Sequence, residues 1–161
     1  MRFLAVVRFL AVLSAGLVAG IFLGDRMGAS FARPALSPSS FVTFQQIQHA
    51  HFVKMMPILI GIAILSSVAW LVLIRARRRS AESVFLALAT VATISVIVLS
   101  RTVHVPINNQ LMTWAASSAP PDVMGIWARW EQAHTVRTVL AVLGFALELS
   151  AYGTSKNVAA P

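Results

Sequence analysis

Two short motifs in this sequence pair histidine with arginine in mirrored order. The chain reads Arg101-x-x-His104 in one segment and His134-x-x-Arg137 in a later one. Residues three apart are neighbours on one face of a helix. If the two segments form antiparallel helices, each histidine lies near one end of the bundle and each arginine lies one turn deeper. Two buried arginines at one depth require anions, supplied either by the protein or by a ligand.

Further polar and aromatic residues lie near these motifs in the sequence. Asn108 and Asn109 follow the first motif, while Trp130 and Glu131 precede the second. Glu131 is the nearest protein anion that could pair with the arginines. Three more polar residues precede another apolar segment: Gln45, Gln48 and His49. Together these residues predict a pocket with an aromatic wall and several hydrogen-bonding groups. The alternative is an interfacial cluster in which arginines extend to lipid headgroups and histidines cap helix ends.

The histidines also raise the question of a metal site. His49 and His51 project about 200° apart on a helix, so they cannot both face one ion. His104 and His134 come from facing helices and could bind copper, iron or haem in a bundle core. Cysteine is absent, carboxylates are scarce, and two arginines would repel a cation. We therefore expect no metal, with His104 and His134 as the ligands if one is bound.

The overall composition indicates that most of the chain is surrounded by lipid. Hydrophobic residues make up 58% and charged residues 11% of the 161 residues, against roughly 45–50% and about 25% in soluble domains. The net charge of +8 comes without a soluble basic region. The basic residues therefore indicate membrane topology rather than a nucleic-acid surface. We expect one all-α domain over residues 1–161, an integral membrane bundle of four transmembrane helices.

The apolar segments position the four spans, because about 20 apolar residues cross a bilayer as a helix. The expected spans are approximately residues 3–24, 53–74, 82–105 and 130–152. Pro106 is expected to end the third span. Residues 25–40 and 107–125 contain prolines and polar residues and are expected to form loops.

The first span contains Arg8 and three regularly spaced glycines. Arg8 is close enough to the beginning of the span to extend to the headgroups. Gly16, Gly20 and Gly24 form a stripe that allows a neighbouring helix to approach closely. This stripe favours a retained helix over a cleaved signal peptide.

Basic and aromatic residues predict the orientation of the bundle. The numbers of lysines and arginines on the two sides are nearly equal, so the cluster within Arg75–Arg79 decides the topology. Short basic loops stay in the cytoplasm, which places both termini there as well. Aromatic residues are expected at the membrane interfaces: Trp114, Trp127 and Trp130 outside, and Trp70 and Tyr152 inside.

Glu148 lies within the fourth span, near its cytoplasmic end. A carboxylate inside a membrane is a functional candidate by default. Pairing with Arg75 or Arg77 is the simpler expectation.

One group of motifs resembles the anthrone oxygenase family, whose members are small four-helix membrane proteins. The segment Val105-Pro106-Ile107-Asn108-Asn109, followed by Trp130, His134 and Val136-Arg137-Thr138, carries the resemblance. Pro34-Ala35-Leu36 and the spacing of the four spans fit the same family, so the resemblance covers nearly the whole chain.

The resemblance implies oxygenation of a small, lipophilic, acidic aromatic compound such as an anthrone, giving the quinone. The conjugate base of such a substrate can react with O₂ directly, so no cofactor is expected. His134 is then the base, with His104 as the second candidate. Arg137 and Arg101 stabilise the anion. The expected substrate-binding residues are Asn108, Asn109, Trp130, Glu131, Gln45, Gln48 and His49.

Two other functions fit the same residues. One is a non-enzymatic membrane protein that binds a partner or a small ligand, and the other is a histidine-ligated metal or haem protein. The characterised oxygenases resemble one fungal branch of the family, whereas the basic Arg75–Arg79 and the short loops resemble bacterial members. This implies the bacterial cytoplasmic membrane as the location.

Overall fold

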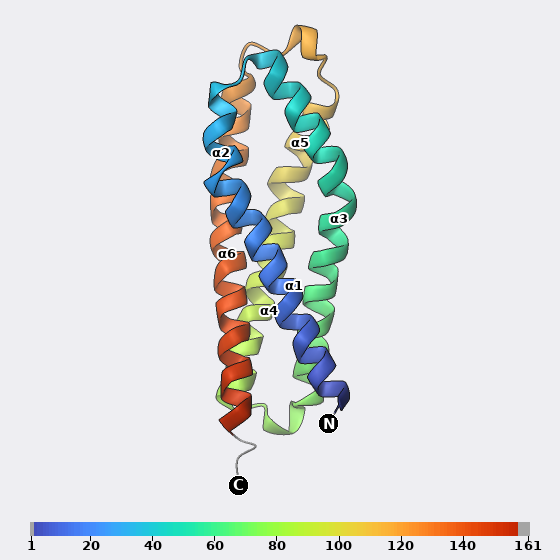
Figure 1. Ribbon diagram of the computed structural model, residues 1–161, viewed down its shortest axis with the longest axis vertical. Helices are drawn as coiled ribbons and strands as arrows, with labels where there is room; N and C mark the ends of the chain where they lie inside the picture. Colours follow the sequence, from blue (N-terminus) through green and yellow to red (C-terminus); the bar gives the residue numbers. More distant parts are fainter. Residues whose placement is uncertain (1, 158–161) are drawn as a thin grey trace.

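The protein is a bundle of four long helices, seen in a computed structural model that describes residues 2–157 (Figure 1). All four are long and apolar enough to cross a membrane. The expected all-α class is therefore confirmed, while Met1 and residues 158–161 of the expected domain lie outside the described residues. The elements in chain order are α1 (Arg2–Met27), α2 (Ala29–Ala32), η1 (Arg33–Ala35), α3 (Pro38–Leu73), η2 (Arg75–Arg77), α4 (Ala81–Leu99), η3 (Ser100–His104), α5 (Val105–Met112), η4 (Ala116–Ser118) and α6 (Val123–Asn157).

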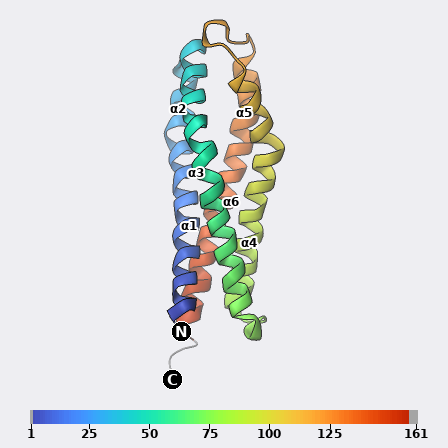
Figure 2. The same cartoon turned by 90° about the vertical axis from the view of Figure 1, so that its right-hand side faces the viewer.

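The long helices stand at the corners of a square. Helix α1 packs against α3 and α6, and α4 packs against the same two helices from the other side (Figures 1 and 2). Helices α1 and α4 are therefore diagonally opposite, as are α3 and α6. The beginning of α1, the end of α6 and η2 lie at one end, here called the termini end. The other end, with α2 and η4, is called the cavity end.

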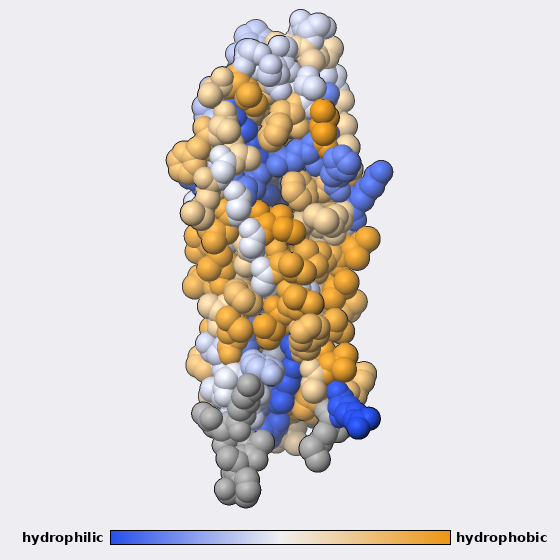
Figure 3. Space-filling view, viewed as in Figure 1, coloured by the Kyte–Doolittle hydropathy of each residue, from blue (hydrophilic) through white to orange (hydrophobic). Residues whose placement is uncertain are grey.

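The outer surface of the bundle suits a lipid environment. Large apolar side chains such as Phe9, Leu65 and Val91 are exposed on its sides. Hydrophobic residues form a broad zone around the middle of the molecule, and hydrophilic residues gather towards both ends (Figure 3). Apolar side chains facing outward are stable only in a bilayer or a comparable apolar medium.

Small residues on α1 allow the close packing that the glycine stripe was expected to provide. Ala11, Ala15 and Ala19 are buried in the bundle. A Cβ atom added at Gly16 would lie 3.0 Å from the Phe145 ring, whereas such a Cβ at Gly20 or Gly24 would meet no described atom of another helix within 4 Å. The expectation that all three glycines pack against a neighbour is therefore wrong. The face of α1 that packs into the bundle therefore carries Ala15 and Ala19, the residues directly before Gly16 and Gly20.

Substitutions at two of these glycines should separate packed from exposed positions. We predict that Gly16→Leu lowers the stability of the detergent-solubilised protein by about 1–3 kcal/mol, because the side chain collides with Phe145. Gly20→Leu should leave stability nearly unchanged, since its Cβ meets open space. Thermal unfolding of the two variants in one detergent measures the difference. Equal losses would contradict this orientation of α1.

A cluster of charged side chains around the buried Glu82 lies at the termini end. Glu82, in the first turn of α4, pairs with Arg8 from α1 and lies 3.3 Å from Nη1 of Arg77. The indole Nε1 of Trp70 donates a hydrogen bond to the same carboxylate at 2.9 Å, and the Arg8 guanidinium lies 5.3 Å from the Trp70 ring centroid. Arg8 therefore turns inward instead of extending to headgroups, and Trp70 is buried rather than interfacial. The cause is Glu82, which offers the cation an anion inside the bundle.

Glu148 does not pair with Arg75 or Arg77 as expected. It is fully buried and forms a hydrogen bond with Ser67. Because α3 and α6 stand at opposite corners, this bond crosses the bundle diagonally, as the Arg8–Glu82 pair does between α1 and α4. Arg77, one of the two arginines expected to reach Glu148, contacts Glu82 instead.

Helical structure extends further at the cavity end than the sequence suggested. Residues 25–40 are mostly helical, because α1 continues to Met27, α2 and η1 follow, and α3 begins at Pro38. The Ser37 side chain caps α3 by accepting a hydrogen bond from the Ser40 backbone N–H. The third span does not end at Pro106 but continues through α5 to Met112. Pro106 is tolerated because it stands in the first turn after η3, a π-helical turn.

The orientation of the bundle in the membrane remains a prediction. We expect a reporter fused after Arg79 to be cytoplasmic and one inserted at residues 115–119 to be external, because the arginine cluster resists translocation. Paired alkaline phosphatase and fluorescent protein fusions measure this. Activity of the phosphatase after Arg79 would reverse the orientation.

Candidate functional site

A cavity of about 500 Å³ lies among the helices at the cavity end. All four membrane-spanning segments contribute to its wall, and Figure 3 shows hydrophilic residues at this level between α1 and α3. The apolar part of the wall includes Phe22, Ile60 and Ile97. All of the expected site residues except Glu131 line the cavity: Gln45, Gln48, His49, Arg101, His104, Asn108, Asn109, Trp130, His134 and Arg137. Its volume is in the range of small-molecule sites.

His104 is held in one tautomer by the backbone. It is only 1% exposed, and its Nδ1 lies 3.3 Å from the carbonyl oxygen of Leu99. A carbonyl oxygen only accepts hydrogen bonds, so Nδ1 carries the proton and Nε2 presents a lone pair. No hydrogen-bond partner of Nε2 exists within residues 2–157. His104 thus combines a fixed tautomer with an unused basic nitrogen.

His134 is held differently, because both of its ring nitrogens face charged groups. Arg137 approaches Nδ1 with Nη2 at 3.1 Å and Nε at 3.3 Å. A guanidinium only donates, so Nδ1 accepts and Nε2 carries the proton. Nε2 lies 3.1 Å from Oδ2 of Asp25. The ring is 1% exposed and sits between a cation and an anion rather than at the rim of the bundle, where we expected it.

Arg33 organises the polar residues around Asp25, and sequence reasoning missed both residues. The guanidinium is 1% exposed and contacts Asp25 at 2.6 and 3.0 Å and Glu131 at 2.8 Å. It also donates to Gln45 and Gln48, each at 2.9 Å. Three residues expected to bind substrate therefore bind Arg33. The chain has only five acidic residues. Because an acidic residue in or beside a membrane span usually needs a cation, a search for basic partners of Asp25 and Glu131 could have identified this cluster.

Two tryptophans form the aromatic wall and shield Arg33. The Trp127 and Trp130 rings stack with centroids 4.3 Å apart, and the Arg33 guanidinium lies 5.5 and 5.3 Å from them. Trp127 donates to Glu131 at 3.0 Å, and Trp130 donates to Asn108 at 2.9 Å. Both side chains are buried, so they do not face lipid as the expected interfacial aromatic residues would. Their N–H groups reach buried acceptors instead.

Arg137 is a cation in the cavity wall without a carboxylate partner within ion-pair distance among residues 2–157. Its contacts are His134, the Ser100 hydroxyl at 3.4 Å, and the rings of Phe22 and Trp130, 4.3 and 5.3 Å away. Glu131, the anion expected to serve it, is bound to Arg33 instead. The charges of Arg33, Arg137, Asp25 and Glu131 sum to zero, but the Arg137 guanidinium has no carboxylate in direct contact and can pair with an anionic ligand.

The mirrored geometry expected for Arg101 holds only in part. His104 and His134 do approach each other, with ring centroids 6.4 Å apart, but Arg101 is exposed while lining the cavity. The cause is the π-helical turn η3, which spans Ser100–His104. A π turn contains more residues than an α turn, so residues three apart no longer share a face. Arg101 is thereby rotated away from His104.

The donor set at this site fits a metal or haem poorly. The two nitrogens of His134 face Arg137 and Asp25, and the guanidinium would oppose a cation bound at Nδ1. Within the described part of the chain, no three histidine or acidic residues group as metal ligands do. Of His104 and His134, only His104 has a ring nitrogen with neither a hydrogen-bond partner nor a charged group in contact among residues 2–157.

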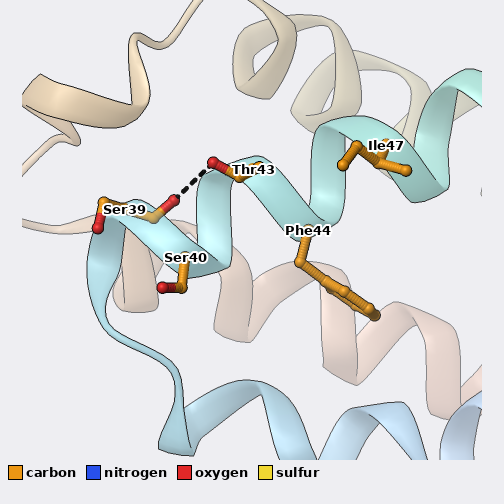
Figure 4. Close-up of a pocket in the computed structure, with 5 residues that line it drawn as sticks. All are labelled: Ser39, Ser40, Thr43, Phe44 and Ile47. Atoms are coloured by element: carbon orange, nitrogen blue, oxygen red, sulfur yellow. Dashed lines mark hydrogen bonds between the residues drawn. The ribbon is translucent and has the colours of Figure 1, made fainter.

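A second hollow lies on the surface at the beginning of α3 (Figure 4). Its lining comes from a single stretch of α3 and carries no charged side chain: Ser39, Ser40, Thr43, Phe44 and Ile47. The Thr43 hydroxyl donates to the Ser39 backbone carbonyl at 3.0 Å, so this group completes its own helix. We assign no chemistry to it.

The fold and the cavity define a class of protein: a multi-pass helical membrane protein with a polar, aromatic-walled site enclosed by its four spans. The chain belongs to the anthrone oxygenase family, whose sequence model matches residues 44–147, more than half of the chain. The resemblance carried by the Asn108–Asn109 and Trp130–Arg137 motifs is thus confirmed. No curated protein and no solved structure matches the chain.

Proposed function

We propose that this protein is a membrane-embedded oxygenase that converts a small, lipophilic, acidic aromatic substrate of the anthrone type to a quinone. The observation that carries the proposal is the juxtaposition of Arg137 and His104 in one cavity wall. Arg137 is a cation with no carboxylate partner, and His104 keeps an unused basic nitrogen, both within residues 2–157. A weak acid needs a base for its proton and a cation for its conjugate anion.

The cavity wall supports a flat aromatic ligand. Trp130 and Phe22 contribute aromatic surface to the wall, and Ile60 and Ile97 add aliphatic surface. Asn108 uses its side-chain oxygen to accept from Trp130, which leaves its N–H₂ group to donate to an oxygen of the ligand. This combination of apolar surface and a few directed polar groups is typical of small-molecule sites.

The hydrogen bonds favour His104 over His134 as the base. His134 already accepts from Arg137 at Nδ1, and its Nε2–H faces Asp25. It therefore has no free lone pair, whereas the Nε2 atom of His104 has one. In this proposal His134 positions Arg137, and the expected order of the two histidines is exchanged.

The reaction balances without a further oxidant or reductant. His104 takes a proton from the substrate C–H, and the electron pair is delocalised onto the ring oxygen beside Arg137. The carbanion carbon then bonds to O₂, and a returning proton completes a hydroperoxide. Loss of water from that carbon forms the second carbonyl, so one O₂ supplies one oxygen atom to the quinone and one to water.

The proposed location is the bacterial cytoplasmic membrane, with the cavity in the outer half of the bilayer. A lipophilic substrate and O₂ both partition into lipid, so both can reach the site from the membrane. Nucleic acid has no part in this function.

Oxygen uptake by the purified protein tests the proposal directly. With a panel of anthrones and hydroquinones, we expect uptake with an anthrone and one quinone formed per O₂ consumed. Saturable binding of the same compounds without turnover would instead support the non-enzymatic binding function. Metal analysis and an absorption spectrum of the same sample test the third possibility, since stoichiometric copper, iron or haem would contradict a cofactor-free reaction.

A further inference from the structure

We propose that Glu148 is a proton-binding site, separate from the cavity, at which a neutral carboxylic acid holds its proton between α6 and α3. The inference concerns a group that the proposed reaction does not use and is independent of it. It rests on the burial of Glu148, on the absence of a cationic partner among the described residues, and on the number of hydrogen atoms available for the hydrogen bonds of the Ser67 hydroxyl.

Glu148 is the buried acid that lacks a cation. Its side chain is 0% exposed. Asp25 and Glu131 each lie within 4 Å of Arg33, and Glu82 lies within that distance of Arg8. Among the described residues no lysine, arginine or histidine makes such a contact with Glu148. An ionised carboxylate without a partner is costly inside a protein that is itself inside a membrane.

The two hydrogen bonds at the Ser67 hydroxyl need one more hydrogen atom than serine supplies, which indicates that Glu148 is protonated. The Ser67 Oγ lies 2.8 Å from the Ala63 carbonyl oxygen and also within hydrogen-bond distance of Oε1 of Glu148. A serine hydroxyl has one hydrogen, and a carbonyl oxygen can only accept. If Glu148 were ionised, one of these two contacts would lack a hydrogen. A protonated Glu148 supplies it by donating to Ser67, while Ser67 donates to Ala63.

Within residues 2–157, the surroundings give an ionised Glu148 no hydrogen-bond donor other than Ser67. Oε2 of Glu148 has no hydrogen-bond partner within residues 2–157. Gly144, one turn before Glu148 on α6, packs against Thr93 of α4. The hydroxyls of Thr90 and Thr93 both donate to carbonyls of their own helix.

At the termini end, where Glu148 lies, the charged side chains of Glu82, Arg8 and Arg77 are already paired with one another. Trp70, one turn beyond Ser67 on α3, donates to that cluster. Glu148 therefore has no charge to compensate its own, and it is satisfied only when protonated.

Binding of this proton is coupled to helix packing. The hydrogen bond between Glu148 and Ser67 joins diagonally opposite helices, so it lies across the middle of the square. Release of the proton would leave a charge there without a counterion. Water or a separation of α3 and α6 would have to accompany that release.

Infrared spectroscopy of the full-length protein in lipid vesicles tests the proposal. At neutral pH we expect the carbonyl stretch of a protonated carboxylic acid, downshifted in D₂O and lost in Glu148→Gln. Glu82→Gln, the matched control, should keep the band because Glu82 is ionised beside Arg8. Absence of the band in the wild-type protein, or its survival in Glu148→Gln, would overturn the proposal.

A second variant retains the carboxyl group and covers the case in which Glu148→Gln does not fold. Ser67→Ala removes the acceptor of the proposed hydrogen bond. The band should then persist and move to higher frequency, as for a carboxylic acid without a hydrogen bond. An unchanged frequency in Ser67→Ala would contradict the assignment of the proton to this pair.

Discussion

Replacing His104 with glutamine should reduce anthrone-dependent oxygen uptake by about 10²–10⁴-fold, the usual contribution of a general base. Glutamine is similar in size and can still donate to the Leu99 carbonyl oxygen, but it offers no basic nitrogen. The loss should appear in kcat rather than in substrate affinity, since Arg137 and the aromatic wall remain. Oxygen-electrode kinetics across substrate concentrations measure both quantities.

A matched control comes from another histidine of the same chain. His51 is exposed and does not line the cavity. His51→Gln should therefore retain wild-type oxygen uptake. If His104→Gln and His51→Gln are equally active, His104 is not the base. If His104→Gln keeps its activity while a variant of His134 loses it, the order of the two histidines is the one expected from the sequence.

Replacing Arg33 with methionine should cause the largest loss of stability among single substitutions, about 3–5 kcal/mol, the usual cost of removing one partner of a buried ion pair. Methionine fills much of the same volume but leaves the carboxylates of Asp25 and Glu131 without their cation. Gln45 and Gln48 lose a donor at the same time. Thermal unfolding in detergent, followed by circular dichroism, measures the effect.

Arg26 provides the control for this substitution. It lies in the last turn of α1, but its hydrogen bond to Thr135 is exposed, and its guanidinium lies over the Phe31 ring. Arg26→Met should therefore change stability by well under 1 kcal/mol, as is usual for exposed contacts. Similar unfolding temperatures for the two variants would show that the Arg33 cluster does not stabilise the bundle.

The fold class could be predicted from the sequence because it depends on long apolar segments, which a lipid environment requires. The ends of those segments were less predictable. Residues 25–40 contain Pro34 and Pro38, which are common in loops, yet Pro38 stands in the first turn of α3, where its missing N–H costs nothing. Pro106 was read in the same way and is likewise accommodated at the beginning of a helical segment.

Which residues line the site could be predicted from the sequence, but the hydrogen bonds and ion pairs between them could not. His104, Asn108 and Trp130 were identified by type and spacing, and they do line one cavity. The partners of Arg33 could not be identified, because they lie on three different helices and their contacts depend on how α1, α3 and α6 are packed. Arg101 was misplaced since a π turn cannot be recognised from residue spacing.

The two diagonal bonds described above determine which part of the molecule can change shape. Four helices that touch only along the sides of a square can move into a rhombus without losing any of these contacts. A bond across a diagonal, here called a tie, prevents this movement. Arg8–Glu82 and Ser67–Glu148 are such ties, one on each diagonal, and both lie towards the termini end. At the cavity end, Asp25–His134 and Arg137–Ser100 join neighbouring corners, but Arg33 of η1 donates to Gln45 on α3 and to Glu131 on α6. The α3–α6 diagonal is therefore linked at both ends, and we expect the separation of α3 and α6 to stay fixed when a flat ligand enters the cavity.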